Sequence, residues 1–420
     1  MLGRIARRGG AHAPAHRGPD PRGAVAMNAA AWRITLSAAL LMALVTGSRA
    51  AGALYLSPLN SATGVGLAGL SLGLAIGQLG VGLLQPVIGA LADRLGASRI
   101  VACGAVLLAL FTVAPAAWPQ AAPVLLALVL ATLAGSAVAS NALLLGPVNR
   151  TVPAARAGQA VAIVGAGASA GQLLLGPATQ WAIEDWGWRS ALVASGVVLV
   201  FALPLSRALR GAPCAPVRRE GGAGTAGRAS LRRTALRDSR FWRVAASFGL
   251  CGFHIAFLTA HMPGVIERCG LPVSLAGRWM AVSGAANVVG SLAVGALLRR
   301  SDPARLLAAV YVLRALGIGT LLVVPATPTL MLGFALAMGA THMATLPPTS
   351  QLVARDHGVQ QLGALFGVVM LVHQLGSFGG VWLGGWAAAA TGGDALLWRV
   401  DLGLALLAAA LAWSLRPLGR

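Results

Sequence analysis

Lysine is missing from this chain, and all 32 permanently basic residues are arginines. Without lysine the chain cannot form a G-x-x-x-x-G-K-[ST] phosphate loop, which excludes direct driving by ATP through this polypeptide. Charged residues make up only 10% of the 420 residues, whereas 57% are hydrophobic and the mean hydropathy is +0.76. So little polar surface cannot cover so much apolar material in water, so the composition indicates an integral membrane protein.

Cysteines and acidic residues are also few. The four cysteines are scattered without C-x-x-C spacing, which predicts neither a metal site nor a disulfide framework, and no cofactor is expected. Of the eleven acids, only Asp401 clearly enters an apolar segment, near its end. The first half of the chain therefore lacks an embedded carboxylate for proton relay.

Long apolar segments fill the rest of the chain. About twenty apolar residues in a helix cross a hydrocarbon core of about 30 Å, and the segments lack the polar–apolar alternation of a β-barrel. We therefore predict an all-α membrane protein with twelve transmembrane helices, at 34–57, 69–91, 99–118, 122–146, 159–183, 188–210, 241–264, 275–298, 304–325, 328–352, 360–390 and 395–416.

The arginines predict the orientation. The N-terminus, the even-to-odd loops and the C-terminus hold 26 of them, whereas the opposite loops hold four. By the positive-inside rule both termini are expected to be cytoplasmic, in the inner (plasma) membrane. Membrane topology and anionic lipid account for most of the net charge of +21, so no nucleic-acid partner is expected.

The predicted spans fall into two halves of similar length. Residues 1–33 contain no apolar signal-peptide core and are predicted to be a disordered cytoplasmic tail, with Met27 as a candidate start. A Gly- and Arg-rich linker at 211–240 separates bundle 34–210 from bundle 241–416, and a short tail, 417–420, follows. Six spans on each side favour two pseudo-symmetric bundles around a central site.

One motif carries a specific resemblance. The stretch Gly89-Ala-Leu-Ala-Asp93-Arg94-Leu-Gly96-Ala-Ser-Arg99 follows the second span and resembles the G-x-x-x-D-R-x-G-x-R/K signature of the major facilitator superfamily. Charges beside a helix end can bond neighbouring helix ends, and glycines permit tight packing and a sharp turn. Gly89, Asp93, Arg94, Gly96 and Arg99 are therefore expected to act as gate elements rather than as substrate ligands.

Three further stretches resemble bacterial monocarboxylate-transporter-like members of that superfamily. They are Gly47-Ser-Arg49-Ala-Ala-Gly52, the glycine-rich run from Gly165 to Pro177 followed by Gly187-Trp188-Arg189, and the run from Cys251 to Phe257 with His261 and Pro263. The resemblance spans both halves and implies the major facilitator fold. It says little about the substrate.

Arg49 is the leading candidate ligand. A charge deep in the first span costs on the order of 2.5 to 3.5 kcal/mol, so it should face protein or a wet cavity. A guanidinium there can bind a carboxylate with two hydrogen bonds, although a structural role toward backbone carbonyls is the alternative. For Arg314, at a similar depth in the ninth span, a structural contact is expected.

Other polar residues complete the predicted substrate site. His254 and His261 are two turns apart on the seventh span and could line the cavity or exchange a proton, with packed histidines as the alternative. Pro347-Pro348 should break the tenth helix just after His342 and free backbone carbonyls. The remaining candidates are Gln172, Asn141 and His373, for which hydrogen bonding between helices is the other explanation.

These observations predict a secondary transporter of a small organic anion, a monocarboxylate in the first instance, working by alternating access with protons as the candidate coupling ion. An exporter of amphipathic compounds is the alternative transporter. A membrane-embedded enzyme is not expected, because no paired-acid metal motif or nucleophile with a base appears. The sequence does not decide the oligomeric state and is compatible with a monomer.

Overall fold

The computed structural model describes residues 27–153, 156–210 and 234–416, and every regular element in those ranges is a helix. The elements of the first half are α1 (Ala29–Ala51), η1 (Gly52–Tyr55), α2 (Leu56–Thr63), α3 (Leu67–Leu95), α4 (Ala97–Ala117), α5 (Ala121–Val138), α6 (Asn141–Thr151), α7 (Ala157–Val200), α8 (Ala202–Ser206) and η3 (Arg207–Leu209). Those of the second half are α10 (Ser239–Arg268), α11 (Ser274–Leu297), α12 (Pro303–Val323), α13 (Pro328–Thr341), α14 (Leu346–His357), α15 (Val359–Thr391) and α16 (Ala395–Trp413).

Capping residues set several helix starts. The Asn28 side chain accepts a hydrogen bond from the Ala31 amide at 2.8 Å, so α1 begins before the predicted boundary at residue 34. Asp238 caps α10 in the same way, and Asp302 caps α12 directly before Pro303. Most of the predicted tail and linker, and residues 417–420, lie outside the described residues.

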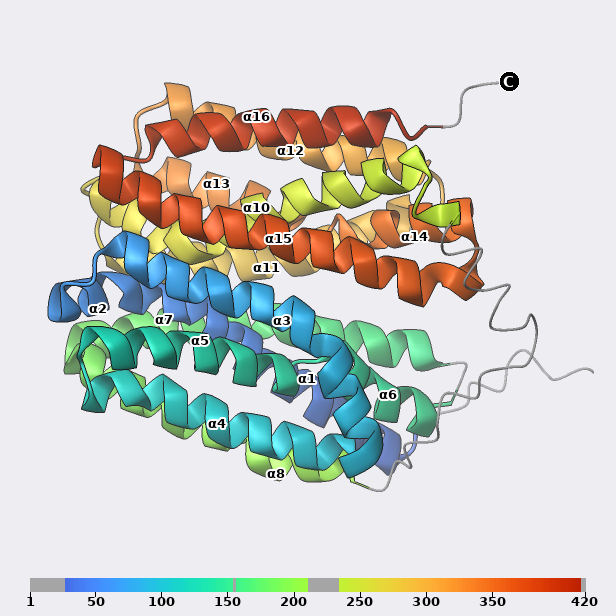
Figure 1. The fold of residues 1–420 in the computed structure, drawn as a ribbon, viewed down its shortest axis with the longest axis horizontal. Helices are drawn as coiled ribbons and strands as arrows, with labels where there is room; N and C mark the ends of the chain where they lie inside the picture. The colour runs from blue at the N-terminus through green and yellow to red at the C-terminus, as the bar shows by residue number, and fades with distance from the viewer. Residues whose placement is uncertain (1–26, 154–155, 211–233, 417–420) are drawn as a thin grey trace, which may run out of the picture.

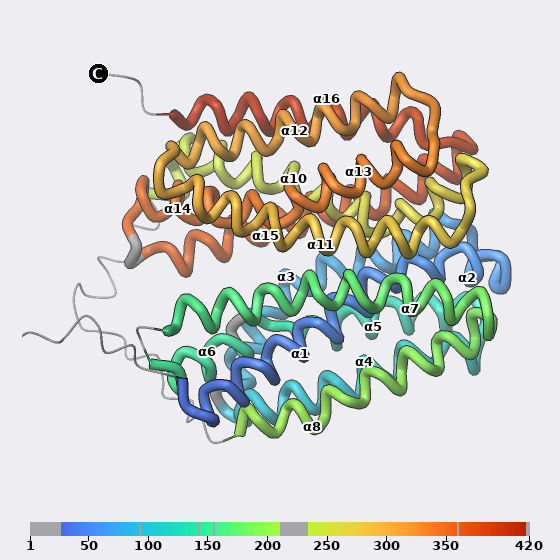
Figure 2. The backbone as a smooth tube through the Cα atoms, turned by 180° about the vertical axis from the view of Figure 1, so that it is seen from behind, coloured from blue at the N-terminus to red at the C-terminus, as the bar shows by residue number. Residues whose placement is uncertain are grey.

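The described part of the chain contains eleven helical segments long and apolar enough to cross a membrane. One of them holds two predicted spans, because α7 has 44 residues and a straight helix of that length would measure about 66 Å. At Gly187 the backbone leaves the helical conformation, with φ 78° and ψ 158°. Figure 2 shows the chain reversing at the end of the first arm and returning toward α8. The prediction of twelve crossings is therefore confirmed.

The helices form two bundles, with α1 to α8 in the lower part of Figure 1 and α10 to α16 in the upper part. The packing of the first bundle repeats in the second. Helix α1 packs on α7 as α10 packs on α15, and α3 packs on α5 as α11 packs on α13. Across the interface, α3 contacts α15 and α7 contacts α11, which are again equivalent pairs. The two halves are thus related by an approximate internal symmetry.

Glycines allow the closest helix approaches inside each bundle. A Cβ atom at Gly171 of α7 would overlap the carbonyl oxygen of Ala43 in α1, and one at Gly376 of α15 would overlap that of Gly249 in α10. By contrast, a Cβ at Gly363 or Gly367 would meet nothing within 4 Å. Gly171 and Gly376 therefore pack helices of the same half together, as small residues commonly do in membranes.

Several contacts between the halves lie away from the chain ends. Figures 1 and 2 show the start of α1 and the end of α16 at the same end of the molecule, here called the chain-terminal end. At the opposite end, the Ser57 hydroxyl donates to Glu267 Oε1 at 3.1 Å, and Ala51, Ala53 and Leu54 pack into the apolar cluster of the second half. Further in, Gln374 Nε2 donates to the carbonyl of Gln78 at 3.2 Å.

Candidate functional site between the two halves

Arg49 lies in the last turn of α1, inside the molecule. Gly47 faces Gly171 and Leu175 of α7, while Ala51 belongs to the apolar cluster of the second half. The turn that carries Arg49 is therefore held between the halves. Even so, its side chain is exposed, and it makes no hydrogen bond or ion pair with any residue in the described ranges. An interior guanidinium next to open space is available to an anionic ligand.

The tenth span is broken, as the Pro347-Pro348 pair predicts. Helix α13 ends at Thr341 and α14 starts at Leu346. Arg314 of α12 fills the break: its Nη2 donates to the carbonyl oxygens of Thr341 and His342, and its Nε donates to Thr341 Oγ1 at 3.2 Å. The expectation of a structural contact for Arg314 fits these bonds, because they satisfy carbonyls that the break frees.

His342 follows α13 at this break and is half-buried. Four other groups, on α12, α10, α15 and α1, lie near enough to interact electrostatically with its imidazole: Arg314, His254, His373 and Arg49. Two permanent positive charges and two further imidazoles thus act on His342, and we call the region around His342 and Arg49 the centre of the interface. Asp401 is the one fully buried carboxylate in the described part of the chain. The centre therefore favours negatively charged ligands.

The structure brings neither His254 nor His261 to open space, since they are 3% and 5% exposed. They also contact different helices. His254 Nδ1 lies 2.6 Å from Asp401 Oδ2 on α16, whereas His261 Nε2 lies 2.8 Å from the carbonyl oxygen of Val381 on α15. Two turns of spacing place them on one side of α10, but both are packed inside the second half.

The other predicted ligands are spread over both halves. Gln172 on α7 is half-buried, and Asn141 begins α6 with a side chain outside the described part. His373 on α15 is half-buried, with its ring 4.6 Å from that of Phe248. Of the predicted substrate residues, His254 and His373 share the electrostatic surroundings of His342 with Arg49.

The predicted gate motif lies at the chain-terminal end, where α3 meets α4. Gly96 has φ 89°, which supports the expected sharp turn, and Arg94 and Arg99 are exposed. A Cβ at Gly89 would meet nothing within 4 Å, so this structure does not show the tight packing expected there. Nothing is described of the Asp93 side chain.

Two partnerships were missed from the sequence. Asn287 of α11 donates through Nδ2 to Ser169 Oγ on α7 at 2.8 Å, and its Oδ1 accepts from the Met343 amide at 3.1 Å. One amide thus connects the broken tenth span to the other half. The second partnership is that of His254 and Asp401. For both partnerships, the only signal in the sequence is the presence of a polar residue within an apolar span.

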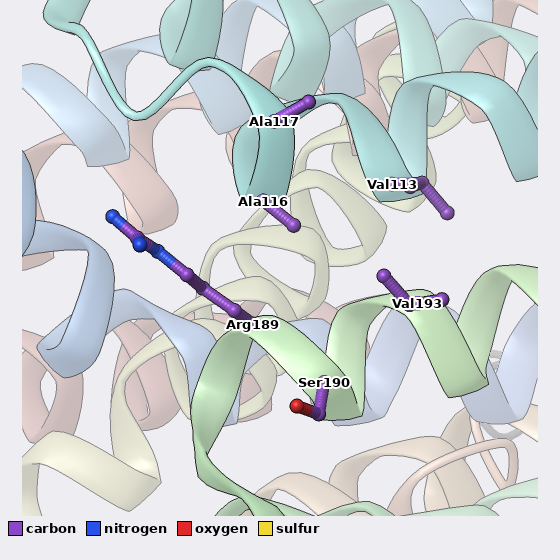
Figure 3. Close-up of a pocket in the computed structure, with 6 residues that line it drawn as sticks. All are labelled: Val113, Ala116, Ala117, Arg189, Ser190 and Val193. Atoms are coloured by element: carbon purple, nitrogen blue, oxygen red, sulfur yellow. The ribbon is translucent and has the colours of Figure 1, made fainter.

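A shallow pocket lies elsewhere, between the end of α4 and the second arm of α7 (Figure 3). It contains none of the predicted substrate residues and is mostly apolar. Its lining residues are Val113, Ala116, Ala117, Arg189, Ser190 and Val193. Arg189 and Ser190 are its two polar lining residues.

Two bundles of apolar helices around a charged centre are the architecture of a membrane transporter rather than of an enzyme. Residues 34–381 match the model of the Major Facilitator Superfamily, and the chain belongs to that family. No curated protein matches the chain.

Solved transporter structures share the fold at low sequence identity. A D-xylose-proton symporter is 16% identical, with a TM-score of 0.72 over 92% of this chain and 98% of that chain. A nucleoside transporter is 13% identical, with a TM-score of 0.75 over 92% and 100% of the two chains. A bacterial homologue of the human lysosomal transporter Spinster, inward-facing and unoccupied, is 16% identical, with a TM-score of 0.69 over 93% and 98%. These likenesses concern the fold alone.

Proposed function

We propose that this transporter carries a small organic anion, a monocarboxylate in the first instance, by alternating access between its two halves. The observation that carries the proposal is Arg49, whose guanidinium is exposed in the interior without a hydrogen-bonding or ionic partner in the described ranges. A planar guanidinium binds a carboxylate through two parallel hydrogen bonds. Arg314 adds a second permanent positive charge that is felt at His342 together with that of Arg49.

The proposal also covers the gate, the membrane and the energy source. The turn from α3 to α4 lies at the chain-terminal end, which we assign to the cytoplasm by the positive-inside rule. Arg94, Gly96 and Arg99 at this turn would hold the cytoplasmic gate in one state. The protein would function in the inner membrane. Its energy would come from an ion gradient, with protons as the candidate ion.

The deciding experiment is uptake of labelled lactate, pyruvate and acetate into proteoliposomes, with and without an imposed proton gradient. Wild type is compared with Arg49→Gln and with Arg189→Gln, a matched control on an exposed arginine outside the centre. Saturable uptake that is lost only in Arg49→Gln is the expected result.

Two other outcomes would change the proposal. If folded wild-type protein takes up none of the three acids but expels amphipathic dyes from cells, the substrate class is wrong and the exporter alternative stands. If Arg49→Gln transports like wild type, the transporter remains but Arg49 is not its anion ligand.

A further inference from the structure

The second half contains a buried acid and base in direct contact, away from Arg49. His254 Nδ1 and Asp401 Oδ2 are 2.6 Å apart, and the two side chains are 3% and 0% exposed. Asp401 Oδ1 is also buried and has no hydrogen-bond partner, while His254 Nε2 lies 3.3 Å from Met338 Sδ. We infer that this pair is a proton-binding site, loaded and unloaded during transport.

The surroundings of the pair explain why one proton would bind there. Phe257 and Trp398 stand about one helical turn from His254 and Asp401 along α10 and α16. The rings of Phe257 and Phe334 pack against the Trp398 indole, with centroid distances of 4.9 Å and 5.7 Å. With the proton bound, the pair is neutral overall, whether it is imidazolium and carboxylate or imidazole and carboxylic acid. Without it, a carboxylate beside a neutral imidazole leaves a net negative charge in apolar surroundings, which is costly. The two residues therefore share a single proton.

Only a proton moves in this step. The loaded pair releases H⁺, leaving neutral His254 and ionised Asp401, and no other bond forms or breaks. The unpartnered Oδ1 atom fits this exchange, since a purely structural carboxylate would be expected to have both oxygens satisfied.

The pair is coupled electrostatically to the region around Arg49 through His342. His254 Nε2 points to Met338, and His342 lies one turn beyond Met338 along the chain and interacts electrostatically with both His254 and Arg49. Negative charge on the unloaded pair would thus be felt where we place the anion. The other titratable or charged groups on the elements packed around the pair are Arg314 and Tyr311 of α12, Cys251 and His261 of α10, His373 of α15 and Arg399 of α16.

This inference deepens the proposed function and rests on it for the coupling role, so the test has two arms. The first uses labelled lactate in proteoliposomes and compares gradient-driven accumulation with exchange at equal pH. Asp401→Asn is expected to reduce accumulation to the level without a gradient while exchange continues. Asp394→Asn, a matched carboxylate paired with Arg268 at the end of α10, should accumulate like wild type. Accumulation by folded Asp401→Asn, or loss of both activities, overturns the coupling role.

The second arm needs no substrate. Infrared difference spectra between about pH 5 and pH 8 report protonation of carboxyl and imidazole groups. We expect one titrating feature in wild type and Asp394→Asn that is missing from Asp401→Asn and from His254→Gln. A spectrum unchanged by both substitutions overturns the proton site itself. If the feature behaves as expected but lactate is not transported, the proton site stands and the proposed substrate fails.

Discussion

Arg49 in the first half and Arg314 in the second are both arginines inside membrane spans, yet their surroundings are opposite. Arg314 is 1% exposed and its donors are taken up by Thr341, His342 and Cys251. Arg49 is exposed and has no such partners within the described ranges. The comparison teaches that an arginine within an apolar helix does not by itself indicate a binding site. It points to a ligand only when its N–H donors lack partners within the protein.

The largest expected effect is on stability, from removing the satisfied arginine. Arg314→Gln should lower the free energy of unfolding by about 1–3 kcal/mol for each carbonyl left without a donor. Thermal unfolding in detergent measures this. Arg305→Gln, which removes an exposed arginine from the same helix, is the control and should leave unfolding unchanged. Equal stability of the two variants would show that the hydrogen bonds of Arg314 at the α13–α14 break do not stabilise the fold.

The reverse pattern is expected for Arg49. Arg49→Gln should unfold like wild type but lose uptake of the labelled acids by about ten- to a hundredfold, the value of a charged hydrogen bond. Arg49→Lys keeps the charge without the planar fork and should retain part of the uptake, with a raised KM. If Arg49→Gln is less stable than wild type but still transports, Arg49 has a structural role like that of Arg314.

The two halves should also respond alike where their packing is equivalent. Gly376→Ala places a methyl group against the Gly249 carbonyl and should cost about 1–3 kcal/mol, as overpacking does. Gly367→Ala, on the same helix but facing open space, should be neutral or slightly stabilising. Gly171→Ala in α7 should match Gly376→Ala, and a harmless Gly171→Ala would show that the packing of the halves is less symmetric than their helix order.

The smallest effect concerns Cys269, just after α10. Burial raises the pKa of its thiol, and the Asp394 carboxylate raises it further. Since the thiolate is the reactive form, its alkylation should speed up with rising pH, and Asp394→Asn should speed it a few-fold at neutral pH. An impermeant maleimide, applied to cells carrying Cys103→Ala and Cys214→Ala, measures this. Labelling only from the cytoplasmic side would reverse the proposed orientation.

Much of the fold could be predicted because span length and apolar composition are local properties. The sequence even predicts separate fifth and sixth spans on either side of Gly187, where the backbone of α7 leaves the helical conformation. Arg49 could be found because a charge among apolar residues is conspicuous. The pairing of His254 with Asp401, 147 residues apart, could not, because nothing local to either residue indicates which helix faces it. The open surroundings of Gly89 could not be predicted for the same reason.

The single residue that joins the two arms of α7 has a mechanical consequence. The first arm packs on α1 and α11 at the interface, and α7 also packs on the peripheral helix α4. With only Gly187 between the arms, the adjoining ends of the two arms cannot move apart by more than the length of one residue. When the first arm shifts at the interface, the near end of the second arm must therefore follow it, while the glycine leaves the angle between the arms free to change.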